Sequence, residues 1–366
     1  MPRALLLRQK DTKMEKLDEI IRNICPANEA ARNASKRRWD SLAKPLGSLG
    51  LLENTVSRIA ALTGSEQVHM KRRVLIVACA DNGVVRRGVS QSDESVTAAV
   101  AAALGAGVST VNYMARCAGC EVLPVDMGIL DFAGAEGVLN RRIRNGTEDI
   151  TASPAMTRDE CVRAIETGAE LVREQLERGA DIILTGEMGI GNTTTSAAVL
   201  SVLLHAAPEG LVGRGAGLSN EGLARKLHAV KTAIEVNRPD AEDVIDVLSK
   251  LGGLDIAALC GVFLGGARYR VPVVIDGLIS AAAALCAYRL CENARCAMLA
   301  SHVSAEPAGA LVLDALGLSP LIMAKMRLGE GSGAVALLGL IDMALSVYNS
   351  GHSFDALGIE AYTPQS

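Results

Sequence analysis

The stretch at residues 184–198, LTGEMGIGNTTTSAA, combines three glycines, one carboxylate and a run of threonines. Glycines such as Gly189 and Gly191 let the backbone turn tightly and expose its N–H groups, and the polar residues after them can cap a helix. A glycine turn that leads into a helix N-terminus binds anions, because the unpaired N–H groups and the positive end of the helix dipole point the same way. The stretch therefore predicts a phosphate site, with a purely structural turn as the alternative. The carboxylate of Glu187 inside the loop has no evident use in an anion site.

Two further glycine loops follow, GRGAG at 213–217 and MRLGEGSG at 326–333. Glu330 lies between two glycines just before an apolar helix, where a flexible backbone can present its carboxylate to a cavity. The alternative is a charge that stabilises the helix N-terminus. Arg327 is a candidate phosphate ligand, with an ordinary surface charge as the alternative. Together the loops favour carboxylate acid–base chemistry on a phosphate-bearing substrate.

The sequence argues against several other chemistries. The five histidines show no metal-ligand spacing, so we expect no metal. Neither the Gly-Lys-Ser/Thr ending of a P-loop nor a complete dinucleotide fingerprint is present, and we expect no cofactor. No Gly-x-Ser-x-Gly elbow is present for serine hydrolysis. The formal net charge of −4 gives no electrostatic reason to expect nucleic-acid binding.

Apolar runs of strand length alternate with helical patterns, which predicts an α/β fold with a doubly wound, mainly parallel sheet and helices on both faces. The run Val74–Ala80, VLIVACA, is typical of a strand buried on both faces. Ligands collect at the carboxyl ends of such strands, where Asp81, Asp126, Glu187 and Asp276 are expected to gather.

The chain divides into four expected parts. Residues 1–13 are expected to form a disordered leader, 14–70 an N-terminal helical segment, 71–348 a Rossmann-like core and 349–366 a tail. The first and last helices are expected to form a smaller helical lobe beside the sheet.

Composition limits the class of protein further. Hydrophobic residues make up 49% of the 366 residues and charged residues 21%, which is typical of a globular chain. The nine cysteines are odd in number and scattered, as expected for reduced thiols in the cytoplasm. No secretory signal is visible, and every apolar stretch is interrupted by charge too early to span a membrane.

The motifs together resemble the nicotinate-nucleotide–dimethylbenzimidazole phosphoribosyltransferase family, which prepares the lower ligand of cobamides. The matches cover roughly residues 40–345 in the family's order: LAKPLGSLGLLE at 42–53, ADNGVVRRGVS at 80–90, VDMGI at 125–129, RNGTEDI at 144–150, GEMGIGNTTTSAA at 186–198, GRGAGL at 213–218, SHVSAEP at 301–307 and MRLGEGSGA at 326–334.

The resemblance implies a reaction between two small molecules. Nicotinate mononucleotide loses nicotinate, and a nitrogen of 5,6-dimethylbenzimidazole or a related base attacks the ribose C1′ with inversion to an α-linkage. The pyridinium leaving group is already activated by its charge, so the protein mainly has to position the substrates and remove a proton from the incoming base.

The resemblance also implies which residues act. Glu330 is the implied general base, and Glu187 is implied to face the ribose in the same site. A base works best with a pKa near the working pH, so we expect Glu330 to be partly buried with a raised pKa. The implied nucleotide-binding residues are Gly189, Gly191, Asn192, Thr193, Gly215, Ala216, Lys226 and Arg327. The implied base-binding residues are Asp81, Asn82, Ser90, Glu94, Met188 and Ser304.

The sequence departs from the family pattern at three places. The usual ADHG reads ADNG at 80–83, Glu94 replaces the usual glutamine, and Ala308-Gly309 replaces a Gly-His pair. Asn82 and Glu94 fall where the incoming base is expected to bind. We therefore hypothesise that the enzyme accepts another benzimidazole, a purine or a phenol in place of, or besides, dimethylbenzimidazole.

Two other functions remain open. The chain is alternatively a weakly catalytic or non-catalytic paralogue that acts as a partner subunit or binds a nucleotide or α-riboside, or it transfers phosphoribose to an unrelated base. Glu187 and Glu330 argue against a pure binding protein, which needs no acid in each loop. The family further implies a homodimer.

Overall fold

The structure is a computed structural model that describes residues 15–363, so the expected leader at 1–13 lies outside the described residues. Six parallel strands form one sheet in the order β3-β2-β1-β4-β5-β6. The strands are β1 (Arg73–Ala80), β2 (Cys120–Gly128), β3 (Leu139–Asn140), β4 (Ile182–Met188), β5 (Val273–Ile275) and β6 (Met298–Ala300). The chain moves outward from β1 to β3 and then returns to start the other half at β4. The switch point between β1 and β4 is where such sheets bind ligands.

Strand β1 lies at the centre of the sheet and is buried along nearly its whole length. Side chains alternate between the two faces of a strand, so Val74 and Ile76 enter one core while Leu75 and Val77 enter the other. This burial on both faces explains the continuous apolar run in the sequence. The expected doubly wound α/β class is confirmed.

Helices cover both faces of the sheet. One face is covered by α7 (Arg158–Glu177), α8 (Asn192–Leu203), α10 (Val244–Leu251), α11 (Leu254–Tyr269) and α12 (Leu278–Leu290), with α9 (Asn220–Asn237) and α13 (Gly309–Ala315) outside them. The other face is covered by α5 (Ser95–Gly105), α6 (Thr110–Cys117) and the first part of α14 (Ser332–Ser350). Short 3-10 turns lie at Gly83–Arg87, Pro208–Gly210 and Glu292–Ala297.

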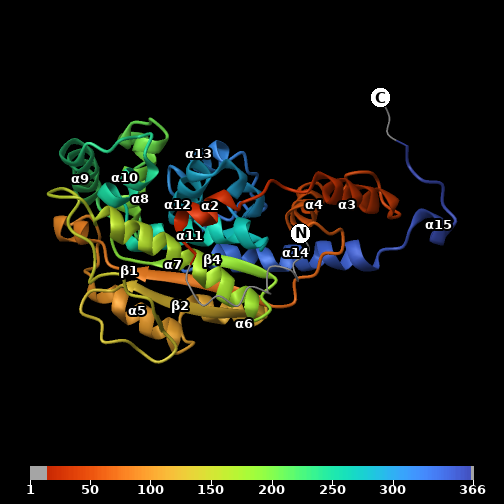
Figure 1. Cartoon of the computed structure of the whole chain (residues 1–366), viewed down its shortest axis with the longest axis horizontal. Helices are drawn as coiled ribbons and strands as arrows, with labels where there is room; N and C mark the ends of the chain where they lie inside the picture. Colours follow the sequence, from red (N-terminus) through yellow and green to blue (C-terminus); the bar gives the residue numbers. More distant parts are fainter. Residues whose placement is uncertain (1–14, 364–366) are drawn as a thin grey trace.

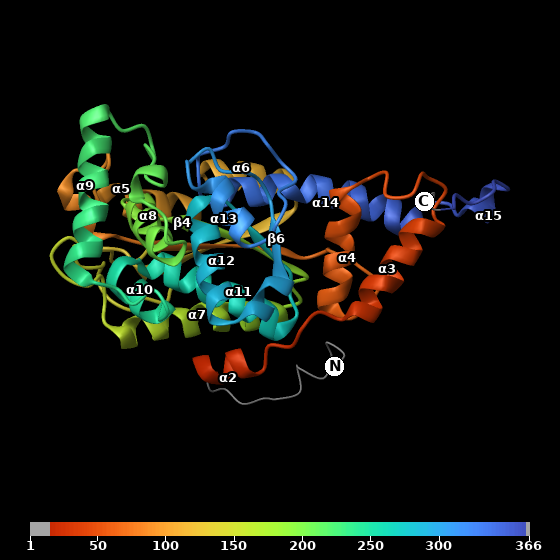
Figure 2. The same ribbon diagram turned by 90° about the horizontal axis from the view of Figure 1, so that it is seen from above.

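A smaller helical lobe is built from both ends of the chain, as expected. Helices α3 (Glu29–Ser41) and α4 (Leu51–Thr63) lie beside the distal half of α14, away from most of the sheet (Figure 1, Figure 2). Trp39 is buried against Tyr348 with ring centroids 4.9 Å apart, and Arg38 donates to the carbonyl of Tyr348 at 2.9 Å. The short helix α15 (Phe354–Leu357) follows, and Ser353 just before it forms a β-bridge with Leu42.

Helix α2 (Leu17–Arg22) is placed differently from the rest of the 14–70 segment. It packs against α7 and α11 of the sheet domain, and the N–H of Leu17 donates to the Glu166 carboxylate at 3.0 Å. The apolar face formed by Leu17 and Ile20 therefore joins the core of the sheet domain and not the small lobe.

The run of small and apolar residues at 95–117 forms two helices and not one. Helix α5 ends at Gly105, and Gly107 adopts a left-handed φ of 76° before α6 begins. By length and composition, Ser95–Cys117 and Ser332–Ser350 are apolar enough to cross a membrane, which the charge pattern had not led us to expect. The break at Gly107 leaves two pieces of 11 and 8 residues, each too short to cross a bilayer. Helix α14 is largely a core helix, because its first part packs on the sheet.

Candidate active site

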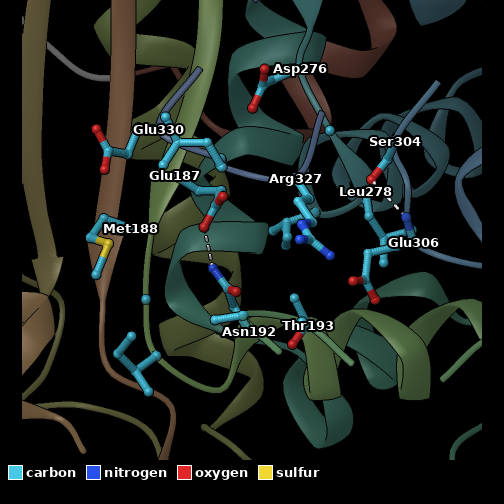
Figure 3. Close-up of a pocket in the computed structure, with 18 of the residues that line it drawn as sticks. Glu187, Met188, Asn192, Thr193, Asp276, Leu278, Ser304, Glu306, Arg327 and Glu330 are labelled. Carbon is cyan, nitrogen blue, oxygen red and sulfur yellow. Dashed lines mark hydrogen bonds between the residues drawn. The ribbon is translucent and has the colours of Figure 1, made fainter. Parts of the chain in front are cut away.

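A cavity of about 290 Å³ opens at the carboxyl edge of the sheet, beside the switch point between β1 and β4 (Figure 3). All three glycine loops of the sequence line it, at 187–193, 215–216 and 326–330. The segment before and inside α5 and the residues that follow β5 and β6 complete its walls. The topology therefore brings the loop at 326–330 to the other two, which lie more than 100 residues earlier in the chain.

Glu187 lies near the end of β4 with its carboxyl group turned toward Asn192 at the start of α8 (Figure 3). The Asn192 amide donates one hydrogen bond to Glu187 Oε2 and another, of 3.0 Å, to Asp255 Oδ2. Burial raises the pKa of Glu187 to about 8, and the negative charges of Asp255, Asp276 and Glu330 act in the same direction. Glu187 is therefore protonated at neutral pH. A neutral carboxyl group does not repel an anion, which resolves the difficulty of an acid in this loop.

Glu330 is held in an unusual backbone conformation. Gly329, Glu330 and Gly331 all have left-handed φ angles, of 84°, 59° and 90°. A residue with a Cβ pays roughly 1–2 kcal/mol for that conformation. The side chain is half-buried, on the same side of the cavity as Met188 (Figure 3), and its Oε2 lies 3.5 Å from the N–H of Val111 in the first turn of α6.

Asp276 follows β5 and contacts the start of α14. Its carboxylate accepts hydrogen bonds from the N–H groups of Gly331 at 3.2 Å, Gly333 at 2.7 Å and Ala334 at 3.1 Å. Burial raises the pKa of Asp276 to about 6, although these backbone hydrogen bonds favour the charged form. The His302 ring packs so closely on Gly333 that a Cβ there would lie 1.9 Å from its Nδ1.

A cluster of donors and cations forms another wall. Thr193 lies in the first turn of α8, and Lys226 of α9 donates to its Oγ1 at 2.7 Å and to the Gly213 carbonyl at 3.0 Å. Gly215 lies beside both side chains, since a Cβ there would be 3.2 Å from Thr193 Oγ1 and 3.6 Å from Lys226 Nζ. Burial lowers the pKa of Lys226 to about 8, so the amine keeps its charge at neutral pH. Arg327 points into the cavity from the loop before α14 (Figure 3).

An apolar wall lies opposite these cations. It is formed by Val96 and Val100 of α5 together with Met188 at the end of β4 and Ile190 of the β4–α8 loop. Such a surface suits a flat aromatic ring. Ser90 adds a polar group.

The structure brings most of the sequence-predicted site residues to the cavity wall. Those that line it are Glu187, Met188, Gly189, Gly191, Asn192, Thr193, Gly215, Ala216, Ser90, Ser304, Arg327 and Glu330. Lys226 lies one layer behind, in contact with Thr193.

Asp81, Asn82 and Glu94 are not among the lining residues. Asn82 is buried beneath the β4–α8 loop, where a Cβ on Gly191 would be 3.3 Å from its own Cβ. Asp81 accepts the N–H of Leu130 at 2.8 Å, and Glu94 precedes the first residue of α5.

Several lining residues were not singled out in the sequence for binding or catalysis. Asp276 was expected only at the sheet edge, and His302 and Glu306 lie within the quoted SHVSAEP motif. One carboxylate oxygen of Glu306 is buried with no hydrogen-bond partner in the part of the chain that the structure describes. Asp255 is fully buried with a pKa raised by burial to about 6, and it contacts the site through Asn192. The Asp-Gly pair after β5 was the available signal for Asp276.

This arrangement defines a class of protein. A glycine loop at a helix N-terminus, two nearby cations and two glutamates at the switch point of a doubly wound sheet together suit a transferase that acts on a phosphorylated sugar. Within residues 15–363, no group of three or more His, Cys, Asp and Glu side chains is arranged to hold a metal ion.

Comparison with known proteins gives the particular family. A family model described as phosphoribosyltransferase matches residues 24–359. The chain is 46% identical over 347 residues to the nicotinate-nucleotide–dimethylbenzimidazole phosphoribosyltransferase of Ruminiclostridium cellulolyticum, covering 95% of this chain and 99% of that one. It is 47% identical over 349 residues to the enzyme of the same name from Acetivibrio thermocellus, with the same coverage. The crystal structure of CobT from Thermus thermophilus superposes with a TM-score of 0.86 at 36% identity, over 91% of this chain and 100% of that one. The chain belongs to the nicotinate-nucleotide–dimethylbenzimidazole phosphoribosyltransferase family.

Proposed function

We propose that the chain transfers the phosphoribosyl group of nicotinate mononucleotide to a benzimidazole-type base. The products are nicotinate and an α-riboside 5′-phosphate, which is α-ribazole 5′-phosphate when the base is 5,6-dimethylbenzimidazole. The reaction activates the lower ligand for the nucleotide loop of cobalamin and related cobamides. The observation that carries the proposal is that Glu187 and Glu330 line the same cavity. One wall of this cavity carries Thr193, Gly215 and Arg327, and another wall is apolar.

The nucleotide phosphate binds at the wall formed by Thr193, Gly215 and Ala216. This wall lies at the N-terminal end of α8, where the positive end of the helix dipole favours the charge of the phosphate. Lys226 fixes the Thr193 hydroxyl through a 2.7 Å hydrogen bond and supplies a positive charge from behind. Arg327 supplies a second charge from the opposite loop (Figure 3). These contacts place the ribose between the two glutamates.

The chemical step needs one base and no external activator. A ring nitrogen of the incoming base forms a bond to C1′ while the bond from C1′ to the nicotinate nitrogen breaks. The bonding electrons neutralise the pyridinium, and attack from the opposite face inverts the β-linkage to α. The N–H proton of the incoming base moves to the carboxylate of Glu330. Glu187 faces the ribose as a neutral acid that donates a hydrogen bond without adding charge.

The incoming base stacks against the apolar wall of Val96, Val100, Met188 and Ile190. Ser90 and Ser304 offer hydroxyls at its edge. Asn82 lies beneath the β4–α8 loop and Glu94 is the N-cap residue of α5, so their departures from the family pattern act on base choice through the position of this loop and of α5. We retain the hypothesis that the enzyme accepts a base other than, or besides, dimethylbenzimidazole.

The direct test is an assay with purified protein. The chain is incubated with nicotinate mononucleotide and, in turn, with benzimidazoles, purines and phenols, and nicotinate and the α-riboside phosphate are quantified. We expect both products in equal amounts with at least one base, and loss of turnover in Glu330→Gln. Release of no nicotinate with any base favours a binding protein. Equal turnover of Glu330→Gln and the native chain contradicts the role of Glu330.

We further propose that the chain acts as a homodimer in the cytoplasm. Tyr113 of α6 and Met343 of α14 are each 58% exposed, and both helices carry apolar sequences. A second copy of the chain accounts for such side chains on a folded enzyme. All nine cysteines are unpaired, in keeping with a reducing compartment. Light scattering of the native chain and of Met343→Glu tests the dimer: the native protein is expected at twice the chain mass.

A further inference from the structure

The loop that carries Glu330 is closed by a backbone hydrogen bond of its own, from the Ser332 N–H to the Gly329 carbonyl at 3.0 Å, but its backbone is strained. Three consecutive left-handed residues, 329–331, precede α14, and the middle one has a side chain that disfavours that conformation. The N-cap position of α14 is Gly331, which has no side chain to accept the free N–H groups of the first turn. The loop therefore depends on groups from elsewhere in the chain.

Asp276 is the group that meets this need. It lies 55 residues before Gly331 and follows β5, which lies between β4 and β6 in the sheet. Its Oδ2 accepts the N–H of Gly331, the residue next to Glu330, while Oδ1 accepts the N–H groups of Gly333 and Ala334. One rigid carboxylate thus binds both the loop and the helix that follows it.

Asp276 is itself held in place. Its own N–H donates to Ser280 Oγ at 3.2 Å, and its backbone is fixed by β5, which pairs in register with β4 and β6. The same sheet carries Glu187 at the end of β4. The sheet therefore positions one glutamate directly and the other through Asp276.

We infer that Asp276 is the positioning residue of the general base. By accepting hydrogen bonds from the backbone N–H groups around Gly331, it holds the Glu330 carboxylate where it can accept the proton of the incoming base. This inference rests on the proposed function, because it assigns a role relative to that reaction. Asp276 moves no proton in the reaction. Its effect on turnover passes through Glu330.

The variant Asp276→Asn tests this role with little change in volume. The amide oxygen can still accept from Gly333 and Ala334, but the amide nitrogen then faces the N–H of Gly331, so donor meets donor at the bond nearest Glu330. We expect kcat to fall roughly tenfold to hundredfold, since an error of about 1 Å in a reacting group costs about that much. The KM for nicotinate mononucleotide is expected to stay within about twofold, because the phosphate wall is untouched.

A double-mutant cycle separates positioning from general stability. If Asp276 acts through Glu330, then adding Asp276→Asn to Glu330→Gln lowers kcat no further than Glu330→Gln alone, within about threefold. The inference is overturned if the loss of kcat in the double variant is the product of the two single losses. It is also overturned if kcat for Asp276→Asn stays within about twofold of the native value. The control is Asp342→Asn, which removes an ion pair with Arg73 from the solvent side of the same helix and is expected to leave kcat unchanged.

A crystal structure of Asp276→Asn gives an answer that does not depend on turnover. The inference expects residues 329–331 to leave the left-handed conformation, and an unchanged loop overturns it. If the native chain releases no nicotinate while the loop still moves, the proposed function fails and the positioning contact stands. Asp276→Ser, whose hydroxyl can accept one helix N–H, replaces Asp276→Asn if the latter does not fold, and the same loop shift is expected.

Discussion

Gly186 offers a sharp test of how closely the two glutamate loops must approach. It lies in β4, one residue before Glu187, and pairs with Val77 in the centre of the sheet. A Cβ at this position would lie 2.6 Å from the carbonyl oxygen and 2.8 Å from the carbonyl carbon of Glu330. Both are backbone atoms, so no change of rotamer relieves the contact. Gly186→Ala therefore forces the Glu330 loop away from β4.

The size of the effect follows from those distances. Ordinary contact begins near 3.4 Å, so the Glu330 backbone must move by about 0.8 Å, which is 3.4 minus 2.6. A misplacement of about 1 Å costs about a hundredfold in rate, or roughly 2.7 kcal/mol in the activation free energy. We expect kcat for nicotinate release to fall by that order, with a much smaller change in the KM for nicotinate mononucleotide.

The matched control is Gly339→Ala, an exposed position within α14 where a Cβ meets no atom within 4 Å. Alanine favours the helix by about 1 kcal/mol over glycine, so this variant is expected to be slightly more stable and fully active. The kcat of each variant is measured by steady-state kinetics at saturating base, and its stability is measured by thermal unfolding. A Gly186→Ala enzyme with native kcat would refute the reasoning, because it would show that Glu330 need not keep its position to act.

Three further predictions use the same assay and standard unfolding measurements. Lys226→Met is expected to raise the KM for nicotinate mononucleotide about tenfold, because a hydrogen bond from a charged group contributes roughly 1.5–3 kcal/mol. An unchanged KM would show that Lys226 does not contribute to phosphate binding. Glu187→Gln is expected to keep most of its turnover at pH 7, because Glu187 has a pKa of about 8 and is already neutral, whereas Glu187→Ala is expected to lose it. As pH rises from about 4.5 to about 8, the unfolded chain loses this proton before the folded one, so the native free energy of unfolding falls relative to Glu187→Gln; parallel pH curves would contradict the raised pKa. Trp39→Ala removes a buried ring from its contact with Tyr348 and is expected to lower the free energy of unfolding by about 3–5 kcal/mol in denaturant titrations. A loss under about 1 kcal/mol would show that the small lobe does not depend on this contact.

Much of the fold could be predicted from the sequence, because local signals and tertiary environment agree there. The run VLIVACA is a central strand buried on both faces, and Thr157 with Glu160 three residues later forms a capping box at the start of α7. Failures came where few residues decide the structure. The break between α5 and α6 depends on Gly107 in a run of small residues, and β3 has only two residues.

The site divides in a similar way. Glycine loops reveal themselves by composition, so Glu187 and Glu330 could be selected from the sequence, and the structure places both at one cavity. The partners of these residues could not be selected, since Asp255 and Asp276 act through bonds that exist only after the sheet has formed. Asn82 shows the converse: the family resemblance implied a place at the base pocket, yet Gly189 and Gly191 pass over it in the folded chain.

Helix α14 joins two regions that a domain diagram would draw apart. It begins two residues after Glu330 and ends in the small lobe, where Tyr348 contacts Trp39 and donates to the Glu66 carbonyl at 2.8 Å. At 1.5 Å per residue its 19 residues span about 28 Å without an intervening loop. One continuous helix thus connects the small lobe to the Glu330 loop. A rotation of the lobe turns this helix and moves the loop that carries Glu330, so the bending stiffness of α14 limits how independently the two regions can move.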